Sequence, residues 1–260
     1  MKYEIIQSGS DGNCTVIEEY VAVDIGVPWY KIAPHAKDLT LVLCTHQHGD
    51  HFNRRTVRTL ARSRPLLRWA CGEWMTEHLI AAGVDKRNID VFEMGKWYRY
   101  QIGDRLIGAK EILVSPFETQ HDVRNCGWKI FKDYGNSIFY ATDLGTLQGI
   151  EGRGFKTYLL EANYTEADLQ RRLEEKLETG EFAHETRVAE NHLSWEEASA
   201  WLGEQMAPDS IWIPMHQHKE REVKQDAVQN AQGYAPNLPE REQPDGLPVS
   251  GMDSPDHLCG

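Results

Sequence analysis

The stretch THQHGDH, residues 45–51, places three imidazoles and one carboxylate within six residues of each other. It follows LTLVLCT, a nearly continuous apolar run that is typical of a strand buried on both faces. Loops at strand ends can bring side chains together at one point, and imidazole with carboxylate suits zinc, manganese or iron. His46 and His48 can hold one ion, while Asp50 and His51 can reach a second. The stretch therefore predicts a metal site.

Three later strands also end at polar residues that can serve as ligands. His121 follows the apolar run ILVSPFE, Asp143 ends SIFYATD, and His216 follows IWIPM. Taken singly, each of these residues could be incidental. Because all three stand where an apolar strand stops, we expect them to meet at the loop 45–51, with Asp143 between the two ions.

The rest of the chain predicts an α+β protein. Short apolar runs bounded by Gly, Asp and Asn indicate strands, beginning with a meander over the first 25 residues. The segment YGNS favours a hairpin turn. Gly83 is expected to end one helix, and Ser194 with Glu197 forms a capping box that begins another. Helices are predicted over 53–63, 73–82, 165–181 and 195–205.

Length and composition fit one large domain followed by a tail. The chain has 260 residues, of which 40% are hydrophobic and 26% charged, which is ordinary for a globular protein. Beyond about residue 222 apolar periodicity is lost. The sequence therefore predicts a domain over 1–221 and a polar, flexible tail over 222–260.

The chain carries no segment that predicts membrane insertion or secretion. It has no run of eighteen apolar residues, and its first ten residues lack the pattern of a secretory signal. The five cysteines are scattered and form no CxxC pair, so neither a disulfide framework nor a zinc knuckle is expected. A cytoplasmic protein is predicted.

Charge is distributed unevenly. The formal net charge of −12 argues against general affinity for nucleic acid, yet residues 54–68 contain six arginines directly after the metal loop. One interpretation is a groove for phosphates in which Arg54, Arg55 and Arg58 contact substrate. The alternative is a solvated helix face. Trp69 and Trp74 could stack bases, although tryptophans are more often part of a core.

The order of these motifs resembles the metallo-β-lactamase superfamily. The pattern HxHxDH, then a His, an Asp and a last His, each after a strand, covers roughly residues 1–220. The resemblance implies an αββα sandwich of two mixed sheets flanked by helices, with two divalent ions at one edge. Its implied site residues are His46, His48 and His121 for the first ion, Asp50, His51 and His216 for the second, Asp143 as a bridge, and Asp24 as a support of the metal loop from behind. His218 competes with His216, which is favoured because it lies nearer the strand.

Three further stretches resemble the YycJ/WalJ-like exonuclease branch. They are SGSDGNCTVIE, LLEANY at 159–164 and NHLSWEEA at 191–198. Glu161 and His192 correspond to a pair in the related tRNase Z branch that helps protonate the leaving oxygen. A carboxylate beside a histidine favours the imidazolium form, which can donate a proton. The alternative is that Glu161 caps backbone and His192 enters a helix. The long exosite arm of tRNase Z is not visible in the sequence.

The sequence therefore predicts a dinuclear phosphodiester hydrolase, exonuclease-like and acting on DNA or RNA. Its catalytic residues would be Asp50, Asp143, Glu161 and His192, with two divalent ions, zinc or else manganese. The alternative is a small-molecule hydrolase, such as a cyclic-nucleotide phosphodiesterase, lactonase or thioesterase, which the acidic net charge favours. A non-catalytic binding protein is a third reading. No membrane partner is expected, and the sequence leaves open whether the chain forms a homodimer.

Overall fold

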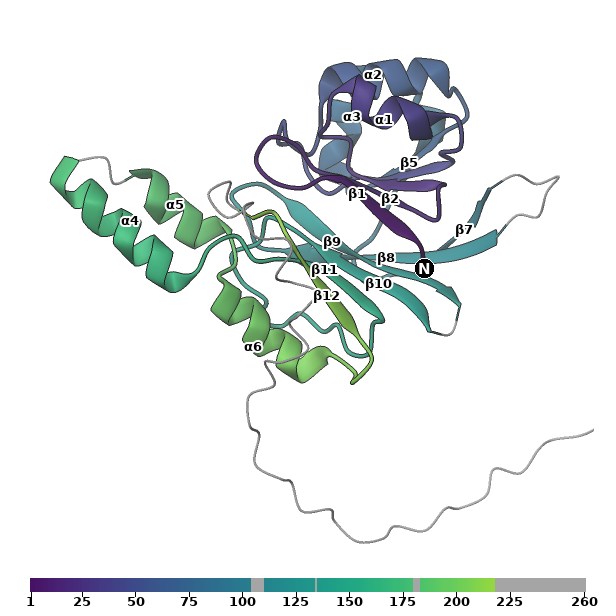
Figure 1. Cartoon of the computed structure of the whole chain (residues 1–260). Coiled ribbons are helices and arrows are strands. Elements are labelled where there is room, and N and C mark those ends of the chain that lie inside the picture. Colours follow the sequence, from purple (N-terminus) through teal and green to yellow (C-terminus); the bar gives the residue numbers. More distant parts are fainter. Residues whose placement is uncertain (104–109, 134, 180–182, 218–260) are drawn as a thin grey trace, which may run out of the picture. The chain divides into compact units, whose positions relative to one another are not determined.

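Two mixed β-sheets form the centre of the protein. The computed structural model describes residues 1–103, 110–133, 135–179 and 183–217 (Figure 1). In the first sheet the strands follow chain order, with antiparallel pairs among the first three and parallel pairs from the third onward. These strands are β1 (Tyr3–Gln7), β2 (Cys14–Ile17), β3 (Val21–Val23), β4 (Leu41–Leu43), β5 (Arg68–Cys71) and β6 (Ile89–Val91).

The second sheet runs in the reverse order, from β12 to β7. Its pairs are antiparallel from β7 to β10 and parallel from β10 to β12. The predicted hairpin joins β9 to β10, and Gly135 takes up the positive φ of 87° that its turn requires. The strands are β7 (Tyr98–Ile102), β8 (Lys110–Thr119), β9 (Asn125–Asp133), β10 (Asn136–Ala141), β11 (Thr157–Glu161) and β12 (Ile211–Met215).

The first sheet is apolar on both faces because each face packs against a different layer. In β3, Val21 and Val23 lie in the core between the sheets, whereas Ala22 lies in the core under the helices. In β4, Val42 likewise points to the helices. This alternation is the two-residue period of a strand, and it explains why LTLVLCT reads as a continuous apolar run.

Helices cover the outer faces of both sheets, as Figure 1 shows. The first three lie over the first sheet, and α6 packs on the second through Ala198 and Leu202. The α4–α5 pair extends away from the sandwich as a helical hairpin. The helices are α1 (Trp29–Ala36), α2 (Arg54–Ser63), α3 (Thr76–Ala82), α4 (Glu166–Thr179), α5 (Ala183–Asn191) and α6 (Trp195–Gln205), with 3₁₀ turns η1 (Glu73–Met75) and η2 (Lys86–Asn88).

This order of layers is the αββα sandwich that the sequence predicts, so the predicted fold class is confirmed. The capping box of Ser194 and Glu197 begins α6 as predicted, and Gly83 ends α3 with φ of 96°. Two helices were not predicted, α1 and α5. The predicted tail and His218 lie outside the described residues. Among the described helices, none has the length and apolar character needed to cross a membrane.

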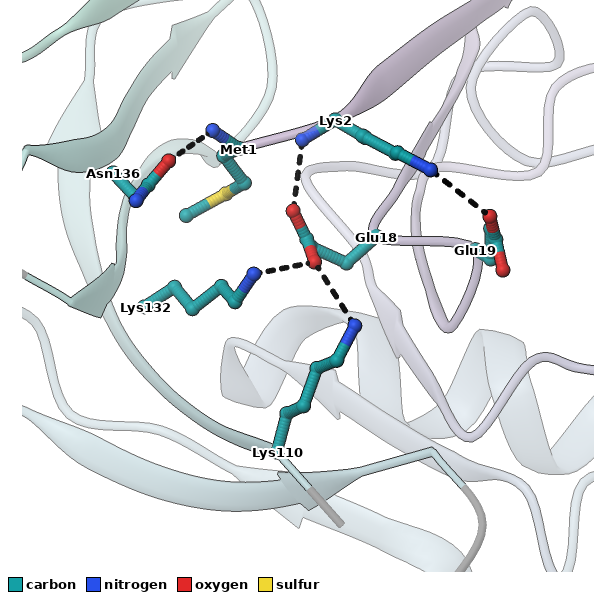
Figure 2. A pocket seen from close by; sticks show the side chains of 7 residues that line it. All are labelled: Met1, Lys2, Glu18, Glu19, Lys110, Lys132 and Asn136. Carbon is teal, nitrogen blue, oxygen red and sulfur yellow. Dashed lines mark hydrogen bonds and ion pairs between the residues drawn. The ribbon is translucent and has the colours of Figure 1, made fainter. Parts of the chain in front are cut away.

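Glu18 joins the two sheets at the turn between β2 and β3 (Figure 2). Its carboxylate is buried, accepts a hydrogen bond from Lys132 Nζ at 2.8 Å and lies 3.6 Å from Lys110 Nζ. The backbone amide of Lys2 donates to its other oxygen at 2.8 Å. Burial alone would raise the pKa of Glu18, but Lys132, the Lys2 amide and Lys110 together lower it. The first sheet is therefore tied to β8 and β9 of the second by a buried carboxylate.

We expect Glu18→Gln to lower the free energy of unfolding by about 1–3 kcal/mol at pH 7, because an ionic acceptor is lost. Since the folded-state pKa of Glu18 lies below its unfolded value, the stability it contributes is present above pH ~4.3 and is lost as the pH falls through the folded pKa. Urea unfolding of both proteins at pH 7 and at decreasing pH should show the difference narrowing. Glu19→Gln is the matched control, because Glu19 is 66% exposed and faces Lys2 only at 3.9 Å. Equal losses in the two variants would contradict this role.

Candidate metal centre

The loop that follows β4 is fixed in place by backbone contacts with two earlier turns. The amide of Asn13 donates to Asp50 O at 2.6 Å, and that of Ile25 donates to His51 O at 3.1 Å. A side chain at Gly26 would place its Cβ only 1.7 Å from Asp50 O, so only glycine fits there. The glycine-containing turns near the N-terminus therefore hold the loop 45–51.

Asp24 supports this loop from behind, as the sequence predicts for its position. One carboxylate oxygen accepts from the amide of Thr45 and the other from its hydroxyl, both at 2.9 Å. The second oxygen also lies 2.7 Å from His51 Nδ1. The contact fixes the ring so that His51 Nε2 points toward the centre of the site.

Three histidines form the first candidate ligand group. Ring nitrogens of His46, His48 and His121 lie within 4.8 Å of one another. His46 Nδ1 contacts Thr45 Oγ1 at 3.0 Å, and His121 Nδ1 lies 3.3 Å from Asn191 O. In each of these two rings Nδ1 makes the supporting contact, and Nε2 is the nitrogen that could bind an ion.

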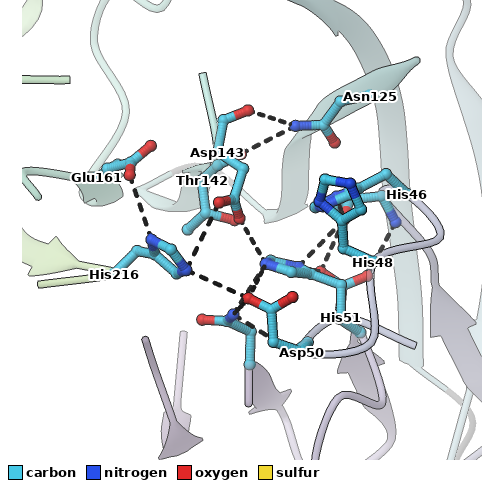
Figure 3. A network of polar contacts seen from close by, with 12 residues as sticks. His46, His48, Asp50, His51, Asn125, Thr142, Asp143, Glu161 and His216 are labelled. Carbon is cyan, nitrogen blue, oxygen red and sulfur yellow. Dashed lines mark hydrogen bonds and ion pairs between the residues drawn. The ribbon is translucent and has the colours of Figure 1, made fainter. Parts of the chain in front are cut away.

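Two histidines and two aspartates form a second group beside the first (Figure 3). Asp143 lies at its centre, 2.5 Å from His51 Nε2 and 3.5 Å from His216 Nε2. Asp50 lies 3.4 Å from His216 Nε2. The Asn125 side-chain amide donates to the carbonyls of Thr142 and Asp143 and so fixes the turn that carries Asp143.

Glu161 and His192 form a pair at the edge of the second group. His192 Nδ1 lies 2.6 Å from Glu161 Oε1 and 3.5 Å from Asp143 Oδ1. Glu161 is completely buried, and its other oxygen accepts from the amide of Leu144 at 3.1 Å. Together with Asp143 and His216, the pair also makes a third group that could hold a metal ion.

Three of these residues share an uncommon backbone conformation. Asp24, Asp143 and His216 have φ of 59°, 55° and 50°; Asp24 and His216 directly follow β3 and β12, and Asp143 lies two residues after the end of β10. The left-handed region costs a residue other than glycine roughly 1–2 kcal/mol. Such strain is found mostly where function requires it, and here it turns each side chain toward the loop 45–51.

In the second group, histidines and carboxylates shift one another's pKa values in opposite directions. Burial lowers the pKa of His51, but the carboxylates of Asp143 and Asp24 outweigh it and raise that pKa to about 10. Burial raises the pKa of Asp143, yet the charges of His216 and His51 hold it well below its usual value. In the first group, burial lowers the pKa of both His46 and His121, which favours their neutral, ligand form.

This donor set fits divalent metal ions. His46 Nε2 is buried and has no hydrogen-bond partner among the described residues, and buried polar atoms are rarely left so without a function. Neutral imidazoles with few carboxylates suit zinc and similar ions. A cation would satisfy this atom, and a second cation would offset the charges of the carboxylates Asp50 and Asp143.

The structure brings the predicted ligands together, although their binding of metal stays a prediction. His121, Asp143 and His216 all reach the loop 45–51. The predicted pair of Glu161 and His192 is also in contact.

The arginine segment, by contrast, divides into parts with different surroundings. Arg54 donates to Ala81 O at 3.0 Å and so ties α2 to α3, while Arg55 and Arg58 are exposed. Arg68 pairs with Asp90. Trp69 is buried in the core. Only part of the segment is therefore available to a ligand.

Two polar residues of the site were missed in the sequence. Asn13 Nδ2 lies 2.8 Å from His51 Nε2 and 3.3 Å from Asp50 Oδ2. Asp122 Oδ1 lies 3.2 Å from His121 Nε2 and 3.4 Å from His48 Nε2. The position of Asp122 directly after His121 was a signal for its role, whereas Asn13 reaches the site through the fold of the turn at 8–13.

Comparison with known proteins agrees with this geometry. The family described as Beta-lactamase superfamily domain matches residues 26–216. The chain therefore belongs to the β-lactamase superfamily, and with its sandwich it is a hydrolase of the metallo-β-lactamase fold.

The comparison also finds individual proteins that are similar to this chain. Exodeoxyribonuclease WalJ of Streptococcus pneumoniae is 30% identical over 180 residues, 63% of this chain and 62% of the relative. The chain thus spans less than two thirds of the length of this curated relative. Two solved structures share the fold: the metallo-β-lactamase fold protein YhfI of Bacillus subtilis (14% identity, TM-score 0.61, 88% and 89% of the two chains covered) and the short form of human tRNase Z (13%, 0.57, 85% and 93%).

Proposed function

We propose that this chain is a dinuclear phosphodiester hydrolase that degrades nucleic acid, with an exonuclease-like action. The observation that carries the proposal is the convergence of two adjacent ligand groups around Asp143, with the Glu161–His192 pair against the same carboxylate. Two ions side by side suit the displacement of an oxygen from phosphorus. The names of the relatives, an exodeoxyribonuclease and a tRNase, point to the same substrate class.

The proposed ligands follow from the groups described above. His46, His48 and His121 would hold the first ion, and Asp50, His51 and His216 the second, with Asp143 between them. Zinc is the proposed metal and manganese the alternative. When bound, the ions lower the pKa of a water and offset the charge that develops on the phosphate.

The residues of the chain supply orientation and a proton. Asp24 and Thr45 hold the ring of His51, and Asn125 fixes the backbone of Asp143. His192 makes its contacts with Glu161 and Asp143 through Nδ1, which leaves Nε2 for the departing oxygen. Burial lowers the pKa of His192, but the charge of Glu161 outweighs it and raises that pKa, so a proton is available for the leaving group.

A cationic strip next to the site supports a polyanionic substrate. Arg55 and Arg58 are exposed on α2, which begins three residues after His51, and among the described residues neither forms an ion pair. In a chain of net charge −12, this strip is a local reversal of sign. We propose that it contacts substrate phosphates, as part of the same function, in a cytoplasmic enzyme.

The direct test is digestion of end-labelled DNA and RNA, single- and double-stranded, by the full chain loaded with Zn²⁺ or Mn²⁺. We expect progressive shortening from one end with at least one of these substrates. No cleavage in any of them, by protein shown to carry two ions, would exclude the nuclease. Cyclic nucleotides are assayed in parallel, and turnover of these alone would favour the small-molecule hydrolase, which the acidic net charge supports.

A further inference from the structure

Arg124 is an exposed cation in the segment that carries His121 into the site. This segment, residues 120–124, connects β8 to β9. On either side of Arg124, neighbouring side chains contact the candidate centre: Asp122 lies against His121 and His48, and Asn125 donates to Asp143 O. The backbone of Arg124 is therefore fixed beside the metal groups from both directions.

The guanidinium group of Arg124 lies over the ring of Trp74, with Cζ 4.6 Å from the ring centroid. Trp74 is itself fixed, because its Nε1 donates to Thr45 O at 3.1 Å. Gly72 makes room for the ring: a Cβ there would come within 2.2 Å of two of its atoms. Thr45 immediately precedes His46, so the ring places Arg124 next to the start of the metal loop.

Arg124 forms no ion pair with a carboxylate among the described residues. Asp122, two residues earlier, directs its Oδ1 at the rings of His121 and His48 instead. A guanidinium stacked on an aromatic ring keeps its N–H donors in the plane of the group, where they can bind an anion with two oxygens. The exposed edge of Arg124 is thus suited to a phosphate.

We propose that Arg124, positioned by Trp74, binds a phosphate of the substrate at the entrance to the metal centre. This role deepens the proposed function and rests on it, since the phosphodiester provides the anion. It makes Arg124 a binding residue that selects for anionic esters, and it makes Trp74 a positioning residue. The alternative function, hydrolysis of uncharged lactones or thioesters, would make no use of the positive charge of Arg124.

The test compares Arg124→Gln and Arg124→Lys with the full-length wild-type chain. The control is Arg153→Gln, which removes the same charge from an exposed loop residue before β11. The affinity for a fluorescent single-stranded oligonucleotide is measured in EDTA over a range of salt concentrations, so that nothing is cleaved. KM and kcat are then measured with metal, on the oligonucleotide and on bis(p-nitrophenyl) phosphate.

We expect Arg124→Gln to raise Kd and KM for the oligonucleotide about tenfold, with kcat little changed, because a charge-assisted contact is lost. The slope of log K against log salt should fall by about 0.7, which is the value for one phosphate contact on a single strand. Arg124→Lys should keep the slope and lose part of the affinity, and the control should match wild type. A rise in KM for bis(p-nitrophenyl) phosphate as well would place Arg124 at the reacting phosphate, whereas a rise for the oligonucleotide alone would place it at a neighbouring one.

If Arg124→Gln had the same Kd and the same salt slope as the wild-type chain, this role would be overturned. If that variant were unchanged while the wild-type chain cleaved DNA or RNA, the role of Arg124 would fail and the nuclease would stand. If the wild-type chain bound the oligonucleotide through Arg124 but cleaved none, the nuclease would fail and the anion-binding role would stand. If the wild-type chain neither bound the oligonucleotide in EDTA nor cleaved it with metal, both would fail.

Discussion

Replacing Asp143 with asparagine is expected to reduce hydrolysis by about a thousandfold or more, since several kcal/mol of charge stabilisation in the transition state depend on the metal pair. Asp143 lies 2.5 Å from His51 Nε2, 3.5 Å from His216 Nε2 and 3.5 Å from His192 Nδ1, so it is common to both the second ligand group and the proposed proton donor. An amide keeps the shape of the side chain but offers one poor ligand atom. The metal content should fall below two ions per chain.

The control for Asp143→Asn is Asp209→Asn. Asp209 lies two residues before β12, is 76% exposed and pairs with Lys156. Rates are measured with the oligonucleotide, metal content by elemental analysis, and folding by circular dichroism. A folded Asp143→Asn protein that retained two ions and the wild-type rate would remove Asp143 from the site.

The sequence predicts the part of the site that is local or stands at strand ends. THQHGDH is contiguous, and apolar strands point directly to His121, Asp143 and His216 as the residues that follow them. These residues can be found from sequence because parallel and neighbouring strands bring their ends to one edge of a sandwich. The meander at the N-terminus is predictable for a similar reason, since its turns are rich in glycine.

Contacts that depend on tertiary packing could not be predicted. The left-handed backbone of Asp24, Asp143 and His216 could not be predicted from residue type, because aspartate and histidine are only enriched in that conformation and most of them adopt others. The stacking of Arg124 on Trp74 joins segments 50 residues apart that share no periodicity.

The two helices missed in the sequence lack local signals. Helix α1 contains Pro34 and has no side-chain cap at its start. Helix α5, with the sequence AHETRVAEN, has too few apolar residues for a clear helical pattern. Helix α1 forms through packing instead, because Ile32 and Ala36 are buried.

We expect His192→Ala to lower kcat on an oligonucleotide by about 10²–10⁴, which is the contribution of a positioned general acid. The departing oxygen of a nucleotide is a poor leaving group, so it depends on a proton that His192 would supply. In the p-nitrophenyl ester of thymidine 5′-monophosphate, the group that departs is p-nitrophenolate. This anion is stabilised by its ring and needs no such proton. On that substrate the loss should be within about tenfold, and Glu161→Gln should show the same preference, since Glu161 holds the ring at 2.6 Å.

Metal analysis of His192→Ala separates the two roles that the geometry allows for this pair. His192 and Glu161 also belong to a group with Asp143 and His216 that could hold an ion. If the pair moves a proton, the variant keeps two ions and loses activity according to the leaving group. If the pair holds metal instead, the variant loses an ion, and the rate of hydrolysis falls equally for both substrates. Because His192 makes its polar contacts with Glu161 and Asp143 through Nδ1, while its ring stacks on His216, we expect the ion content to stay at two and the loss to follow the basicity of the departing oxygen.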